Sequence, residues 1–230
     1  MQKDNYILLL LDGEEPSAAI VEKFAKKATK IIATDGAARY AHRHNIPLDV
    51  IIGDMDSISK ETRAFYEKKE TQIISEGDQQ TNDFEKALKY ILAESLVKEI
   101  VVLGIHGKRT DHLLTNFSVM LRYTDDFESL VAYDAMHEHQ FLTAGKHWHS
   151  FNLQIGAPVT LTPLPQAQGI TTSGLYYPLK NETMTFGKRE GLVNIITEDT
   201  ASAMIEGNPT GSLPMTLTVS EYCENSLISL

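Results

Sequence analysis

The 230-residue sequence contains a single cysteine and no long hydrophobic run, and each absence excludes a class of protein. The lone thiol of Cys223 cannot form an internal disulfide, which favours a reducing compartment such as the cytoplasm. The longest apolar run near the start, Tyr6–Leu11, is too short for a signal peptide or a membrane span. We therefore expect a cytoplasmic protein.

Positive charge is also scarce. The chain has 21 Lys and Arg residues against 31 Asp and Glu residues, so its formal net charge is −10 at pH 7. Such a charge repels the phosphate backbone of nucleic acid and the anionic headgroups of a membrane. We therefore expect neither nucleic acid nor a membrane as a partner, and an anionic substrate would need a metal ion to neutralise its site.

Common catalytic signatures are missing too. The sequence has no Walker pattern, no full G-x-G-x-x-G fingerprint and no G-x-S-x-G elbow. No sequence signature therefore indicates one of the usual nucleotide-binding folds or a serine hydrolase.

Short β-rich apolar runs do alternate with segments of helical periodicity up to about residue 134. This alternation is typical of a parallel sheet with crossover helices. The expected strands are Tyr6–Leu11, Lys30–Thr34, Val50–Ile52, Gln72–Ile74, Glu99–Leu103 and Leu130–Tyr133. The expected helices are Ala18–Ala28, Ala37–His44, Lys60–Lys69, Asp83–Glu94 and Asp111–Tyr123.

Beyond about Glu138, prolines interrupt short β-rich runs and no helical pattern competes with them. Short strands separated by turn signals indicate an antiparallel sandwich. The fold class we predict is α/β, with an N-terminal parallel-sheet domain over residues 1–138 and a smaller C-terminal antiparallel β-sandwich domain over residues 139–230. The expected strands of the second domain include Pro158–Thr162, Val193–Thr197, Ala203–Ile205 and Met215–Val219.

Aspartates follow four of the expected strands. Ligands in a parallel α/β sheet bind beyond the carboxyl ends of the strands, so we expect these side chains to converge at one rim. Converging carboxylates repel one another unless a cation joins them, and Mg²⁺ prefers such oxygen ligands. Asp54 and Asp56 would both face the cleft if their loop is extended. The aspartates concerned are Asp35, Asp54, Asp56, Asp78, Asp83 and Asp111.

Residues beside these aspartates suit a phosphate group. Gly53, Gly104 and Gly107 permit a sharp bend or a close approach of the backbone to a phosphate. Arg109 supplies a planar fork of donors for phosphate oxygens. Together with the aspartates, they predict a site for a magnesium-bound phosphate.

Two groups of residues leave alternatives open. Any one of the aspartates can be a turn former or a helix cap, and Asn82 with Glu85 resembles the start of a capping box. Four histidines form two pairs with the spacing of a transition-metal site, although strands place ordinary surface histidines at the same spacing. These are His137, His139, His147 and His149.

Four motifs, taken in order, resemble the thiamine pyrophosphokinase family. The most specific runs from Gly53 to Ile58 (G-D-M-D-S-I) and is similar to the family signature G-D-[FM]-D-S-I. The segment 34–39 (T-D-G-A-A-R) resembles A-D-G-G-A-N, and the segment 78–88 resembles D-Q-D-x-T-D-F-E-K-A-L. The segment 107–112 (G-K-R-T-D-H) resembles G-G-R-x-D-H.

The chain departs from the family pattern at several positions, including Ala37 in place of the second glycine of A-D-G-G-A-N. Tyr177 stands where the family stretch G-L-x-W-P-L has tryptophan. Val193 replaces the serine of an S-N pair, and Gln80 and Asn82 replace an Asp and a Thr. These differences concern thiamine contacts more than metal contacts.

The resemblance implies a reaction and an assembly. Family members use Mg²⁺ to transfer diphosphate from ATP to the hydroxyl of thiamine, which yields thiamine diphosphate and AMP. They form homodimers whose active sites lie between subunits, so thiamine, ATP and a second copy of the chain are the expected partners. The alternatives are a related diphosphokinase for a pterin-like hydroxymethyl heterocycle and a non-catalytic protein that binds thiamine or a nucleotide.

The same resemblance assigns roles to residues. Asp54, Asp56 and Asp83 would hold Mg²⁺ and, with Asp111, form the catalytic group. Thiamine would contact Tyr177 and Asn194. The residues expected around ATP are Asp35, Gly36, Asp78, Gln79, Thr81, Arg109, His112 and Asn116.

Overall fold

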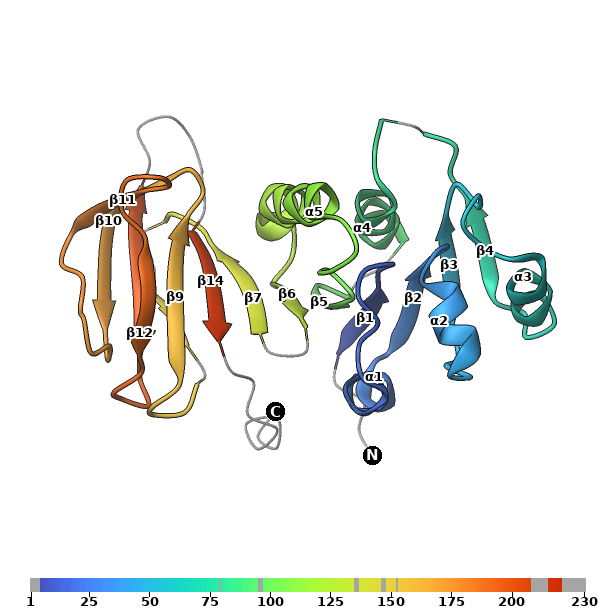
Figure 1. Cartoon of the computed structure of the whole chain (residues 1–230), viewed down its shortest axis with the longest axis horizontal. Coiled ribbons are helices and arrows are strands. Elements are labelled where there is room, and N and C mark those ends of the chain that lie inside the picture. The colour runs from blue at the N-terminus through green and yellow to red at the C-terminus, as the bar shows by residue number, and fades with distance from the viewer. Residues whose placement is uncertain are drawn as a thin grey trace. The chain divides into compact units, whose positions relative to one another are not determined.

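The chain divides into two units, Met1–Asp134 and Ala135–Leu230, each with buried hydrophobic residues of its own (Figure 1). This computed structural model describes residues 5–78, 80–94, 97–134, 137–145, 148–151 and 153–207, and the backbone of residues 215–220.

Six parallel strands form the sheet of the N-terminal unit, in the order β4-β3-β2-β1-β5-β6. All five residues of β1 are buried, as expected for a strand covered on both faces. The chain moves outward from β1 to β4 and then returns to place β5 on the other side of β1. The strands are β1 (Tyr6–Leu10), β2 (Lys30–Thr34), β3 (Val50–Gly53), β4 (Gln72–Ser75), β5 (Glu99–Leu103) and β6 (Ser129–Tyr133).

Helices connect these strands, and polar side chains mark where several of them begin. Ser59 Oγ accepts the backbone N–H of Thr62 at 3.1 Å, and Asn82 Oδ1 accepts that of Glu85 at 2.9 Å. Such bonds satisfy donors that a first helical turn leaves unpaired. The interpretation of Asn82 as a helix start is therefore confirmed. The helices are α1 (Ala18–Lys27), α2 (Ala38–Arg43), α3 (Lys60–Glu67), α4 (Asp83–Glu94), α5 (Thr110–Tyr123) and the short 3₁₀ helix η1 (Thr124–Asp126).

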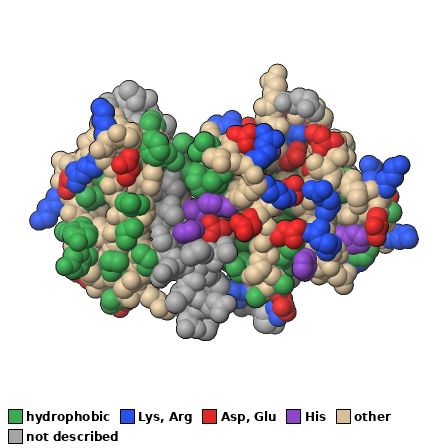
Figure 2. All heavy atoms as spheres, viewed as in Figure 1, with side chains coloured by type: hydrophobic (Ala, Val, Ile, Leu, Met, Phe, Trp, Pro, Cys, Tyr) green, Lys and Arg blue, Asp and Glu red, His purple; other side chains and the backbone are tan. Residues whose placement is uncertain are grey.

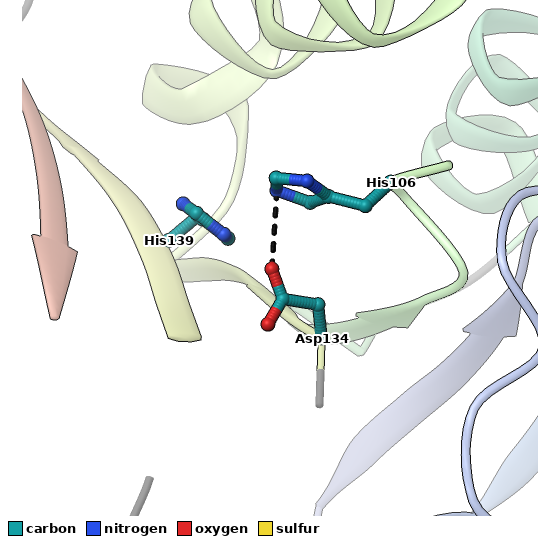
Figure 3. A group of neighbouring side chains, drawn as sticks. All are labelled: His106, Asp134 and His139. Carbon is teal, nitrogen blue, oxygen red and sulfur yellow. Dashed lines mark ion pairs between the residues drawn. The ribbon is translucent and has the colours of Figure 1, made fainter. Parts of the chain in front are cut away.

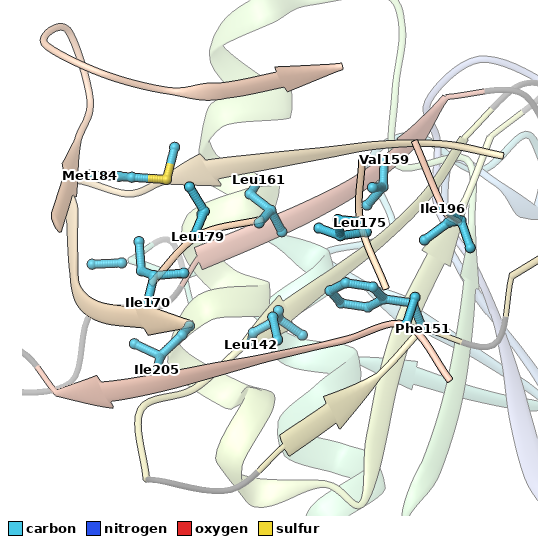
Figure 4. Close-up of a cluster of buried hydrophobic side chains, with 13 residues drawn as sticks. Leu142, Phe151, Val159, Leu161, Ile170, Leu175, Leu179, Met184, Ile196 and Ile205 are labelled. Atoms are coloured by element: carbon cyan, nitrogen blue, oxygen red, sulfur yellow. The ribbon is translucent and has the colours of Figure 1, made fainter. Parts of the chain in front are cut away.

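The C-terminal unit is built from two antiparallel sheets with a hydrophobic core (Figure 4). One sheet has the order β12-β9-β14-β7 and the other β11-β10-β13-β8. Large side chains of this core, such as Phe151 and Leu161, are about 1% exposed. The strands are β7 (His137–Leu142), β8 (Trp148–Ser150), β9 (Pro158–Pro163), β10 (Gln166–Ser173), β11 (Glu182–Thr185), β12 (Gly191–Ile195), β13 (Ser202–Gly207) and β14 (Met215–Ser220).

The predicted fold class is confirmed, with a parallel α/β unit followed by an antiparallel β-sandwich. Every expected element of the N-terminal unit is present, and its ends differ from the expected ends by at most two residues. In the C-terminal unit, β12 begins two residues before the expected strand Val193–Thr197. Strand β10 was not among the expected strands, because its polar and small residues, QAQGITTS, do not form an apolar run.

Candidate active site

A cavity of about 350 Å³ lies at the carboxyl ends of the parallel strands in the N-terminal unit. The strand order reverses between β1 and β5, and open α/β sheets bind ligands at such a switch point. Gly36, Asp56 and Asp111 are not among the lining residues. Eight of the predicted site residues line the cavity, namely Asp35, Asp54, Asp78, Thr81, Asp83, Arg109, His112 and Asn116.

Three carboxylates come together at this end of the sheet. Asp35, Asp54 and Asp56 each offer an oxygen, and these oxygens lie within 4.8 Å of one another. Asp35 is 2% exposed, and its two oxygens accept backbone N–H groups of Gly36 and Ser57 at 2.6 and 3.2 Å. Hard oxygen donors at this spacing fit a Mg²⁺ ion that keeps several of its waters.

The loop that carries Asp54 and Asp56 is not extended, which contradicts the geometry we expected for it. Met55 has a positive φ of 67°, and the backbone N–H of Asp56 donates to Asp54 Oδ1 at 3.1 Å. A tight turn therefore brings the two carboxylates together. Gly53 precedes this turn for a steric reason, since a Cβ at that position would lie 2.8 Å from Asp35 Cγ.

The ionised form of Asp35 is unfavourable when no cation is bound. Burial is the main cause, with the negative charges of Asp83 and Asp54 adding to it, and together they raise the pKa of Asp35 to about 6. Backbone hydrogen bonds from Ser57 and Gly36 oppose this rise but do not cancel it. A cation bound here would therefore relieve an unfavourable charge.

We expect Asp35 to make the metal-free protein less stable as the pH rises from about 4 to about 6. An unfolded aspartate titrates near 3.9, so in this interval the folded state binds a proton that the unfolded state has lost, and the free energy of unfolding falls. The full loss is at most about 3 kcal/mol. Denaturant titrations in EDTA measure it, and Asp35→Asn should lack the decline. The same decline in both proteins would contradict the assignment.

Asp83 begins α4 and already has a cationic partner. The Lys86 ammonium lies 3.0 Å from Asp83 Oδ1, and both residues line the cavity. The side chain of Lys86 is only 4% exposed, and that of Asp83 is 30% exposed. A predicted metal ligand is thus held by a buried lysine one turn further along the same helix.

Two further cations of the cavity are paired with aspartates near the solvent. Lys108 Nζ lies 2.7 Å from Asp12 Oδ1, and Arg109 Nε donates to Asp111 Oδ1 at 3.0 Å. The hydrogen bonds and charge of Arg109 lower the pKa of Asp111 to about 2. Exposed ion pairs stabilise a protein by only about 0–1 kcal/mol. Both cations can therefore exchange a carboxylate for a phosphate oxygen at little cost.

Short polar contacts join described residues that precede α4. Thr81 Oγ1 donates to Asp78 Oδ2 at 2.8 Å, so these two predicted ATP residues also stabilise a local turn. Asn82 Nδ2 donates to Asn116 Oδ1 at 3.2 Å, which links the start of α4 to α5. Gln79, which we expected near ATP, lies outside the described residues.

The loop between β5 and α5 is held from two sides. His106 Nε2 lies 3.2 Å from Oδ2 of Asp134, the residue after β6. A dashed line marks this pair in Figure 3. Gly107 has a φ of 92°, and a Cβ there would lie 2.5 Å from Glu14 Cβ. The loop therefore requires glycine at this position to pass the segment that follows β1.

Three charged residues that line the cavity were not among the site residues predicted from the sequence. Asp12 follows β1, so the rule that selects aspartates after strands would have found it. Lys108 lies inside the G-K-R-T-D-H motif without having been assigned a role. Lys86 had two signals, its place in the segment 78–88 motif and its spacing of three residues from Asp83 on a predicted helix.

Tyr177 and Asn194, the expected thiamine residues, lie together in the C-terminal unit. Asn194 Oδ1 accepts the backbone N–H of Tyr177 at 2.9 Å, and its Nδ2 donates to the Tyr177 carbonyl at 2.7 Å. Asn194 is 8% exposed and Tyr177 is 64% exposed. The ring of Tyr176 lies edge-on to that of Tyr177, with centroids 4.8 Å apart. Asn194 thus supports an aromatic side chain that is presented to solvent.

Exposed apolar side chains are concentrated in the C-terminal unit. Leu192 is 76% exposed and Phe186 is 59% exposed. Figure 2 shows hydrophobic side chains on the surface of this unit and charged side chains crowded on the N-terminal unit. Exposed apolar patches commonly mark interaction surfaces. No helix in the part of the chain that the structure describes is long and apolar enough to cross a membrane.

The paired histidines occupy strands of this unit. His137 and His139 belong to β7, and their ring centroids are 5.6 Å apart. His149 in β8 lies with Nε2 3.0 Å from the carbonyl oxygen of Thr143. Their spacing is accounted for by strand geometry, and His147 lies outside the described residues.

Comparison with known sequences gives consistent matches. The model of the thiamin pyrophosphokinase catalytic domain matches residues 21–131, and that of the thiamin pyrophosphokinase vitamin B1 binding domain matches residues 150–206. Thiamine pyrophosphokinase 1 of Arabidopsis thaliana is 35% identical, over 69% of this chain and 62% of that protein. Thiamin pyrophosphokinase 1 of Caenorhabditis elegans is 26% identical, over 83% of this chain and 82% of that protein. The matched region thus spans somewhat less than two thirds of the Arabidopsis relative.

Solved structures show the same fold. A thiamine pyrophosphokinase from Bacillus subtilis superposes with a TM-score of 0.79 at 19% identity, covering 95% of this chain and 100% of its own. The yeast thiamin pyrophosphokinase has a TM-score of 0.79 at 17% identity, covering 100% of this chain and 90% of its own. Both family models and a relative above 30% identity support the resemblance of the four motifs, and the chain belongs to the thiamin pyrophosphokinase family.

Proposed function

We propose that this chain is a Mg²⁺-dependent thiamine pyrophosphokinase that transfers diphosphate from ATP to the hydroxyl of thiamine and releases AMP. The observation that carries the proposal is one cavity with both carboxylates for a metal ion and cations for phosphates. Relatives that are 35% and 36% identical bear this name. A polyphosphate needs both kinds of group, because its charge must be neutralised and its oxygens positioned.

Different residues of the site would bind the metal ion and the nucleotide. Asp35, Asp54 and Asp56 would hold Mg²⁺, with Asp83 as a further ligand. The bound ion would offset phosphate charge and help to align the attacking and leaving oxygens. Residues expected to contact the nucleotide through polar groups are Asp78, Thr81, Lys108, Arg109, His112 and Asn116.

The reaction needs a general base that accepts the proton of the thiamine hydroxyl. In the reaction, the thiamine hydroxyl oxygen forms a bond to the β-phosphorus, the bond from that phosphorus to the oxygen bridging to AMP breaks, and the hydroxyl proton goes to a carboxylate. Asp83 and Asp111 are the two carboxylates that we consider for this role. The Arg109 guanidinium lowers the pKa of Asp111 to about 2, so Asp111 accepts a proton poorly while that pair persists.

Asn194→Ala should weaken thiamine binding and destabilise the C-terminal unit. The substitution removes both bonds to the Tyr177 backbone and a third from the N–H of Ile195. These bonds are partly buried, so leaving their groups unpaired costs less than the ~1–3 kcal/mol of fully buried groups. We expect the Michaelis constant for thiamine to rise several-fold with little change for ATP. Tyr177→Phe is the control, since it keeps the ring face that would stack on the thiazolium. Unchanged thiamine kinetics in Asn194→Ala would exclude this role.

We infer a homodimer with active sites shared between subunits. The exposed aromatic and aliphatic residues of the C-terminal unit support this inference, because a partner subunit would cover them. If Tyr177 acts on the site of the other subunit, mixing Tyr177→Ala with Asp54→Asn protein should restore one working site per heterodimer. Two results would contradict the inference. One is a fully active sample that light scattering shows to be monomeric, and the other is no recovery of activity on mixing.

We also infer a cytoplasmic location from the lone cysteine, Cys223, which lies outside the described residues. A fluorescent fusion or cell fractionation tests this inference.

One assay tests the proposed activity. Pure protein is incubated with ATP, Mg²⁺ and thiamine, and AMP is separated from ADP. AMP together with thiamine diphosphate is the expected result, and ADP would indicate single phosphoryl transfer. AMP formation with a hydroxymethyl pterin but not with thiamine would favour the pterin alternative, and no ATP consumption with either would favour a non-catalytic binding protein.

A further inference from the structure

Lys86 is a buried cation inside an acidic cavity. Its side chain is 4% exposed, and its ammonium lies 3.0 Å from Asp83 Oδ1. Five carboxylates line the same cavity as Lys86, so the cavity is rich in negative charge. These are Asp12, Asp35, Asp54, Asp78 and Asp83.

Lys86 differs from the other cations of the cavity in that its side chain is buried. The side chains of Lys108 and Arg109 are 50% and 64% exposed, so water can solvate either charge when its ion pair opens. A buried ammonium that loses its paired carboxylate is not solvated in this way, and breaking a buried pair is strongly unfavourable. Lys86 can therefore release Asp83 only if another anion takes its place.

Asp83 is also close enough to the carboxylate cluster to influence it. Its charge helps to raise the pKa of Asp35, one of the three clustered aspartates. Lys86 and a divalent cation would consequently compete for the same carboxylate. ATP brings the replacement anion, since its phosphates would enter the cavity that Lys86 lines.

We propose that Lys86 is a positioning residue that occupies Asp83 in the metal-free site and releases it only when phosphate is present, so that metal and nucleotide bind in concert. This inference rests on the proposed function, because it assumes that the cavity takes a divalent cation and a polyphosphate. It predicts that Lys86 weakens metal binding when no nucleotide is present. A lysine with a purely structural role would have no such effect.

Titration of the protein with Mn²⁺ alone, followed by the electron paramagnetic resonance of the free ion, tests the proposal. Mn²⁺ suits the same carboxylate ligands as Mg²⁺. Lys86→Met should bind Mn²⁺ at least about tenfold more tightly than wild type, the lower end of measured couplings between close charge pairs. Lys108→Met is the matched control, because it removes the same charge from the same cavity and leaves Asp83 untouched. Its effect should be less than about threefold, since an exposed charge is screened by solvent.

A double-mutant cycle tests whether Lys86 changes Mn²⁺ affinity through Asp83. In an Asp83→Asn background, Lys86→Met should change Mn²⁺ affinity by less than about twofold, because the contested carboxylate is gone. Asp83→Asn alone should also change nucleotide-free Mn²⁺ affinity little, about threefold at most, since Lys86 already withholds that ligand. This second result needs no substitution of the buried lysine, so it stands even if Lys86→Met does not fold.

Several results would overturn the proposal. They are an unchanged Mn²⁺ affinity in Lys86→Met, an equal gain in Lys108→Met, a gain that persists without Asp83, and a loss of more than about threefold in Asp83→Asn alone. Failure of the proposed function is distinguishable, because it would show as no AMP formation by wild type whatever the Mn²⁺ affinities are.

Discussion

Asp54→Asn should reduce turnover by about 10²–10³-fold, because losing a metal ligand removes several kcal/mol of transition-state stabilisation and each 1.4 kcal/mol is a factor of ten. Asp56→Asn should behave in the same way. The fold should persist, since the amide oxygen of the substituted side chain could still accept the backbone N–H that now donates to Asp54 Oδ1. Stability without metal should fall little or even rise, because the substitution relieves repulsion with Asp35.

Steady-state kinetics at saturating ATP and Mg²⁺ measure this effect. Asp125→Asn is the matched control, since Asp125 is exposed and does not line the cavity. It should retain wild-type turnover, and its melting temperature should match that of Asp54→Asn within a few degrees. Near-normal turnover in both Asp54→Asn and Asp56→Asn would refute the metal assignment.

Phe151→Ala should destabilise the C-terminal unit by about 3–5 kcal/mol, since it opens a cavity in a close-packed core. Phe151 is 1% exposed and lies among Leu142, Leu175 and Ile196 in the cluster of Figure 4. A loss of this size is a large fraction of the stability of a small domain. We therefore expect the C-terminal unit of the variant to unfold first, at a markedly lower temperature.

Phe186→Ala is the matched control, because Phe186 is 59% exposed and its truncation should change stability by no more than about 0.5 kcal/mol. Differential scanning calorimetry measures both variants. A separate early transition in Phe151→Ala would support the proposed division into domains at residues 1–138 and 139–230. A single transition shared by the whole chain would mean that the two units unfold together.

The architecture of the N-terminal unit was readable from the sequence because its signals are local. Strands such as Tyr6–Leu10 are continuous apolar runs, and helices such as Asp83–Glu94 repeat their apolar residues every three to four positions. The C-terminal unit was less readable. Its strand β10 contains mostly polar and small residues, and their burial depends on partners from β11 and β13.

The sequence by itself determined the order of the aspartate motifs and therefore the edge of the sheet at which they meet. Only the tertiary structure decided which residues share the site. The reversal of strand order between β1 and β5 brings Asp12 within 2.7 Å of Lys108, although 96 positions separate them. Burial decides the character of Lys86, whose charge would read as a solvated helix face in the sequence but is buried in a cavity rich in carboxylates in the fold. Local periodicity specifies elements, whereas the energy of a charge depends on its depth and neighbours, which only the assembled fold supplies.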